Sequence, residues 1–154
     1  TTVKGIGDIA TSLVSTTSAV AQGTIQAVME VGGDLGLAAK GIILGVLRGT
    51  KQAGAATFET ISQTAGSVIK STAEVGGDLG TAAKGLVEGA IEGAKELGLD
   101  TMEAASAAAT GALKGAGEIG SEAGEKVRNA LTGTIAGVKV VLKEPFTKQP
   151  SSKS

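Results

Sequence analysis

The stretch EVGGDLG occurs twice in this chain of 154 residues, at 30–36 and at 74–80, and each copy is followed one residue later by AAKG. The segment EIGSEAG at 118–124 continues the same 44-residue register as a degenerate third copy. Glycines recur at half this spacing, every 22 residues, at Gly32, Gly54, Gly76, Gly98 and Gly120. The sequence therefore predicts a tandem repeat.

A period of 22 residues is twice 11, and 11 residues complete three helical turns at about 3.67 residues per turn, close to a straight α-helix. Each position of the repeat then keeps a fixed place around the helix. On such a wheel all charged residues from Lys4 to Glu144 fall on one face, and most large aliphatic residues fall on the other. The aliphatic exceptions are Met29, Leu37, Leu44, Leu99 and Val140. We expect an all-α fold of tandem 22-residue amphipathic helical repeats over residues 1–143.

The aliphatic face forms a predicted apolar stripe along the repeats. Its representative positions are Ile25, Val31, Leu35, Leu47, Ile69, Val75, Leu79, Leu86, Ile91, Leu97, Leu113, Ile119 and Ile135. A single layer of such helices cannot bury its own apolar side. The stripe must therefore meet a second layer, another copy of the chain, or an apolar surface that is not protein.

The 22-residue glycines indicate joints between helices. In KELGLDTMEA, Gly98 can end one helix in a left-handed conformation, and Asp100 can cap the next helix with Glu103 three residues later. EVGGDLG has the same arrangement. The predicted joint residues are Gly32, Asp34, Gly54, Gly76, Asp78, Gly98, Asp100 and Gly120. The alternative is one long helix that tolerates its glycines at about 0.5–1 kcal/mol each.

A second set of glycines forms GxxxG pairs at one edge of the apolar face. They are Gly45/Gly49, Gly89/Gly93, Gly111/Gly115 and Gly133/Gly137. A spacing of four places both glycines on one side of a helix, where a neighbouring backbone can approach closely. The pairs predict helices packed flank to flank. The alternative is drift toward small residues in a chain rich in alanine and glycine.

Composition argues against catalysis and cofactor binding. The chain has no cysteine and no histidine, and its net charge of -1 favours no contact with nucleic acid. The carboxylates of Glu88, Glu92 and Glu96 lie on the charged face, where solvation explains them better than a metal site. No phosphate-binding glycine motif is present. We expect a non-enzymatic protein without cofactor or metal, and the sequence leaves its compartment open.

Amphipathic repeats of 11 and 22 residues resemble those of apolipoproteins, synucleins and perilipins. The resemblance covers residues 3–142, in period only, and implies binding to lipid surfaces. The chain differs from those families in two ways. Glycine separates its repeats where apolipoproteins typically use proline, and aromatic anchors are missing.

We therefore expect a structural protein that self-assembles with its own copies into a filament, tube or sheet. The alternative is a coat protein whose amphipathic helices bind lipid, a membrane surface or another hydrophobic surface. A stress-protectant chain that becomes helical only on drying or binding is a further reading.

The last segment, EPFTKQPSSKS at 144–154, breaks the repeat phase and holds both prolines of the chain. It is predicted to be an exposed polar tail. Its alternative is a docking peptide anchored by Phe146.

Overall fold

The computed structural model describes residues 19–52 and 58–140. Residues 19–30 are helical, and they are followed by α2 (Leu35–Gln52), α3 (Phe58–Glu74), α4 (Leu79–Leu97), α5 (Thr101–Ile119) and α6 (Ser121–Leu131). Two short strands, β1 (Thr134–Ile135) and β2 (Val138–Lys139), end the described chain. The predicted all-helical architecture with packed helices is confirmed for most of the described residues. The predicted tail at 144–154 and the joint at Gly54 lie outside them.

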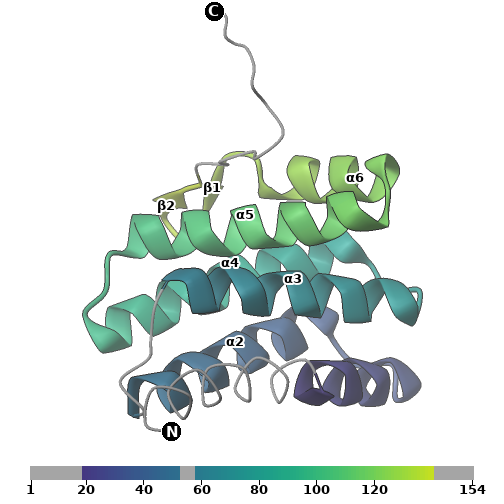
Figure 1. Ribbon diagram of the computed structural model, residues 1–154, viewed down its shortest axis with the longest axis horizontal. Coiled ribbons are helices and arrows are strands. Elements are labelled where there is room, and N and C mark those ends of the chain that lie inside the picture. The colour runs from purple at the N-terminus through teal and green to yellow at the C-terminus, as the bar shows by residue number, and fades with distance from the viewer. Residues whose placement is uncertain (1–18, 53–57, 141–154) are drawn as a thin grey trace, which may run out of the picture.

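The main packing partners are alternate helices in the sequence. The most extensive contacts join α2 to α4 and α3 to α5, and α4 also packs against α5. The helix α6 covers the ends of both α4 and α5. Figure 1 shows the result as tiers of nearly parallel helices, from α2 at the bottom to α5 and α6 at the top. The chain thus builds two adjoining layers, one containing α2 and α4 and the other α3 and α5.

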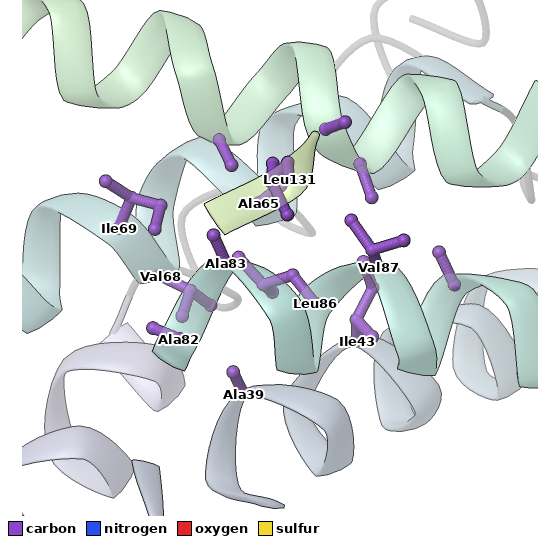
Figure 2. Packing of buried hydrophobic residues seen from close by; sticks show 14 of the residues in the cluster. Ala39, Ile43, Ala65, Val68, Ile69, Ala82, Ala83, Leu86, Val87 and Leu131 are labelled. Carbon is purple, nitrogen blue, oxygen red and sulfur yellow. The ribbon is translucent and has the colours of Figure 1, made fainter. Parts of the chain in front are cut away.

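The two layers bury their apolar sides against each other. Ile43 from α2, Val68 from α3 and Leu86 from α4 are completely buried, and Figure 2 shows them in one interior. Alanines fill much of the remaining space on α4 and α5, which allows the helices to lie close together. Of the three partners expected for the stripe, a second layer of the same chain is the one present among the described residues.

Three helix ends share a left-handed glycine. Gly32, Gly76 and Gly98 have φ values of 70°, 73° and 76°. After Gly76, the N–H of Gly77 donates to the carbonyl of Thr72 at 2.9 Å, which satisfies a carbonyl at the end of α3. The following helix begins at Leu79. Turns of this kind reverse the chain within a few residues, so successive helices can alternate between the layers.

Aspartates cap the helices that follow these turns. The carboxylate of Asp78 accepts from the N–H of Thr81 at 3.1 Å, and that of Asp100 accepts from the N–H of Glu103 at 3.0 Å. Asp34 accepts from the N–H of Gly36 at 2.8 Å. Each carboxylate satisfies an N–H that has no partner inside its helix.

The prediction of helix up to about residue 142 is wrong at the end of the described chain. Thr134 pairs with Lys139 and Ile135 with Val138 in an antiparallel hairpin. The two-residue loop between them has positive φ at both positions, 52° at Ala136 and 82° at Gly137. That geometry is typical of a tight hairpin turn and cannot continue a right-handed helix. Ile135 and Val140 are buried, so the hairpin adds to the core.

Candidate assembly surface

The glycines of α4 form the contact with α2. A Cβ atom on Gly85 would collide with the backbone of Gly36, lying 2.8 Å from its carbonyl carbon. A Cβ on Gly89 would lie 2.8 Å from the carbonyl oxygen of Lys40. A Cβ on Gly93 would lie 2.5 Å from the side chain of Leu47. These distances are too short for an alanine, so the two backbones approach closely because α4 lacks side chains there.

The same contact recurs between α3 and α5. A Cβ on Gly111 would collide with the backbone of Ser62, and one on Gly115 would lie 3.0 Å from Gly66. Four of the five close pairs on the two surfaces are each 49 residues apart, namely Gly85 with Gly36, Gly89 with Lys40, Gly111 with Ser62 and Gly115 with Gly66. The predicted packing glycines Gly89, Gly93, Gly111 and Gly115 therefore all lie in helix contacts within the chain.

The matching surface of α2 has no neighbour among the residues that the structure describes. No described residue lies within 4 Å of a Cβ placed on Gly41, Gly45 or Gly49. Leu37, one turn before Gly41 on the same side of α2, is 66% exposed. We call the surface formed by Leu37, Gly41, Gly45 and Gly49 the α2 edge. The expected packing role of Gly45 and Gly49 therefore has no partner among the described residues, of which α2 forms the outermost helix of its layer.

The remaining predicted pair, Gly133/Gly137, does not lie in a helix. Both glycines belong to the hairpin region, where their φ values are 105° and 82°. Glycine is used there for its left-handed conformation and not for close helix packing. The prediction of a fourth GxxxG helix surface is wrong.

Ion pairs cross the helix contacts on the outer side of each layer. The Nζ atom of Lys40 lies 3.5 Å from Glu92, and the guanidinium of Arg48 donates to both carboxylate oxygens of Glu96 at 3.0 and 2.7 Å. In the second layer the Nζ atom of Lys70 lies 2.5 Å from Glu118. Two of the three carboxylates predicted to be solvated, Glu92 and Glu96, thus pair with cations of the neighbouring helix.

These pairs shift the titration of their members. The hydrogen bond from Arg48 lowers the pKa of Glu96 below its usual value, and the same bond raises the pKa of Arg48. The hydrogen bond from Lys70 lowers the pKa of Glu118. All of these groups are exposed to solvent, so the pairs fix the alignment of the helices more than they stabilise the fold.

Most of the predicted apolar stripe is inside. Ile25, Leu35, Leu47, Ile69, Leu79, Leu86, Ile91, Leu113 and Ile135 are buried. Val75 and Leu97 are half-buried. Val31 and Ile119 are exceptions, 81% and 46% exposed. Val31 lies in the turn that follows the helix of residues 19–30, and Ile119 is the last residue of α5.

Sequence reasoning missed the close contact of Gly85 with Gly36. The signal was present in the second copy of AAKG, which contains Gly85 in phase with Gly89 and Gly93. It also missed the cross-helix ion pairs, whose partners are 48 or 52 residues apart and so fall outside any local pattern.

Two kinds of feature are missing from the part of the chain that the structure describes. Residues 19–52 and 58–140 contain no group of three side chains arranged to hold a metal ion. Within the same ranges, none of the helices has the length and hydropathy needed to cross a bilayer. An open groove of about 540 Å³ lies between the turn at Gly76–Gly80 and α6. Its charged lining is Asp78, which caps α4, and Lys126.

Comparisons of this chain with protein-family models, with curated proteins and with solved structures found no match.

Proposed function

We propose that this chain is a non-enzymatic structural protein, built from tandem 22-residue helical repeats, that self-associates through the α2 edge. Larger assemblies of the filament, tube or sheet type would combine this contact with others. The observation that carries the proposal is that α2 presents the same glycine surface that α4 uses to hold a helix, and that no described residue covers it.

Helix positions and turns support the repeat with glycine joints. The helices α2 and α4 begin at Leu35 and Leu79, 44 residues apart, which is two repeats. Gly32, Gly76 and Gly98 follow the 22- and 44-residue spacing and share a left-handed φ. Gly120 departs from this pattern because its φ of 167° is extended, and no side chain caps α6. At this position α6 follows α5 without a left-handed glycine and packs back against α5 and α4.

The composition of the α2 edge supports an interaction with another molecule. End repeats of a soluble helical array usually present a polar outer face. Here the outermost helix is more apolar than its inner equivalent, because Leu37 corresponds to Thr81 and Leu44 corresponds to Glu88 in the 44-residue register. Leu37 and Leu44 are also two of the aliphatic residues that lie on the charged side of the helical wheel. Exposed apolar side chains at the end of an array are more stable when another molecule covers them than when they face water.

Light scattering coupled to size-exclusion chromatography, together with negative-stain microscopy, tests this proposal on purified protein without lipid. We expect species larger than a monomer whose proportion rises with protein concentration. A chain that stays monomeric across the accessible concentration range, up to the millimolar, would refute self-association.

A lipid-coating function is the second candidate, and one observation favours it. Four of the large apolar residues that are exposed, Val20, Met29, Val31 and Leu37, belong to the first described helices or to the turn between them. Coating by the whole stripe would require the two layers to separate, because most of the stripe is buried between them. Adding liposomes or neutral-lipid droplets and following circular dichroism and co-flotation tests this function. Flotation with lipid by a chain that does not self-associate would favour coating.

A further inference from the structure

We infer that the partner of the α2 edge is the α2 edge of a second copy, so that two chains pair around a two-fold axis. The inference rests on the proposed self-association and specifies its contact surface. It makes the two-fold dimer the unit from which any larger assembly is built. Three features of the molecule carry it.

The first feature is the contact already present between α2 and α4. There, a helix surface with glycines at four-residue spacing receives the backbone of a neighbour. The α2 edge repeats that surface with Gly41, Gly45 and Gly49, and it lies on the opposite side of α2 from the residues that meet α4. Docking of another helix on the α2 edge therefore continues the layer by the same type of contact.

The second feature is the covered opposite end of the array. The hairpin packs on α4 and α5, where the next helices of the layers would lie. Val127 and Leu131 of α6 are completely buried, and Ile135 and Val140 close this end. A head-to-tail contact needs two different surfaces, and at this end the exposed face of α6 carries the charged residues Glu122, Glu125 and Lys126 and no series of glycines like that of the α2 edge. A two-fold contact needs only one surface, used twice.

The third feature is charge. Two cations of α2, Lys40 and Arg48, each pair with a carboxylate of α4, Glu92 and Glu96. Two α2 helices can therefore approach while these two cations remain paired within their own chain. With the axis near Gly45, Gly41 of one copy faces Gly49 of the partner subunit, and each Leu37 covers the end of the neighbouring helix.

A single cysteine tests the symmetry of this contact, because the chain has none of its own. In Gly45→Cys the two thiols would lie close to the axis. We expect copper phenanthroline to convert most of this variant to a disulfide-linked dimer at protein concentrations where Glu88→Cys, an exposed position on α4, stays largely uncrosslinked. Equal and slow crosslinking of both variants would overturn the two-fold arrangement.

Blocking the α2 edge tests whether dimer formation requires this surface. Gly45→Leu places a large side chain into open space, so the monomer should keep its helical content and melting temperature. We expect the dimer dissociation constant, measured by sedimentation equilibrium, to rise by about tenfold or more, as overpacking at a close contact commonly produces. Glu88→Leu is the control for non-specific association caused by an added apolar side chain, and it should leave the dissociation constant unchanged.

The outcomes separate the inference from the proposed function. Oligomers that persist unchanged in Gly45→Leu would show that self-association uses another surface, so the inference fails and the function stands. A parent protein that is monomeric at every concentration tested would contradict both the inference and the proposed function. If that monomer is also destabilised by Gly45→Leu, residues 1–18 of the same chain occupy the edge, which again overturns the inference.

Discussion

Replacing Gly85 and Gly41 by alanine, one at a time, tests the close approach of α2 and α4. The two glycines occupy the same place in the two copies of AAKG, 44 residues apart. Their local sequences and helical positions match, so any gain in helix propensity is the same for both. They differ only in surroundings, because Gly85 abuts the backbone of Gly36 whereas Gly41 has no described neighbour within 4 Å.

Alanine at position 85 has two opposing effects on the stability of the folded state. Alanine in place of glycine stabilises a helix by about 0.5–1 kcal/mol. At Gly85 the new methyl group would lie 2.8 Å from the carbonyl carbon of Gly36 and closer still to its oxygen, and both partners are backbone atoms that cannot rotate away. Forcing the helices apart costs about 1–3 kcal/mol. Gly41→Ala should therefore stabilise the fold, and Gly85→Ala should be less stable than Gly41→Ala by the full overpacking cost of about 1–3 kcal/mol.

Thermal unfolding followed by circular dichroism measures this difference. For a chain of this length we expect Gly85→Ala to melt about 2–12 °C below Gly41→Ala. Both variants should be compared at one protein concentration, low enough for the parent protein to be monomeric. Equal stabilisation by both alanines would refute the close packing of α2 against α4.

Three further predictions concern other parts of the molecule. Because the folded-state pKa values of Glu96 and Glu118 are lowered, their ion pairs contribute stability above the usual carboxyl value of 4.5 and lose it as the pH falls. Replacing both by glutamine should therefore narrow the difference between urea denaturation curves at neutral and acid pH, and an unchanged difference would contradict the role of the pairs. Asp100→Ala should cost about 1 kcal/mol by removing the cap of α5, measured by urea denaturation, with recovery in Asp100→Ser as the check on mechanism. Ala136→Gly should stabilise the hairpin by about 0.5–1 kcal/mol, because alanine is strained at positive φ, and a lower melting temperature would count against the turn geometry.

Much of the fold follows from local pattern. The helical wheel predicted the helices and the burial of residues such as Leu86 and Leu113, because a fixed periodicity places them on one side whatever they meet. The turns at Gly76 and Gly98 could be anticipated because a left-handed glycine and a capping aspartate are local features. Neither argument required knowledge of the neighbours.

The remaining features depend on distant contacts. Gly45 and Gly89 have equivalent sequence surroundings, yet Gly89 lies against α2 and Gly45 lies at the edge. Only the order of helices in the layers distinguishes them. The hairpin was missed because its side chains continue the apolar phase through Ile135, while its backbone leaves the helix at Thr132. Periodicity describes side chains and does not report where the backbone changes its conformation.

Because successive helices alternate between the two layers, the layer of each helix depends on whether an even or an odd number of helices precedes it. Removing 44 residues, a helix from each layer, would shorten the array by one tier and leave every later helix in its own layer. Removing one helix, such as α3, would move the later helices into the opposite layer and place α5 beside α2, so Lys40 and Arg48 would no longer face Glu92 and Glu96 of α4. An array of this kind can lengthen by duplication only in pairs of helices. That constraint gives a physical reason why EVGGDLG returns after 44 residues and not after 22.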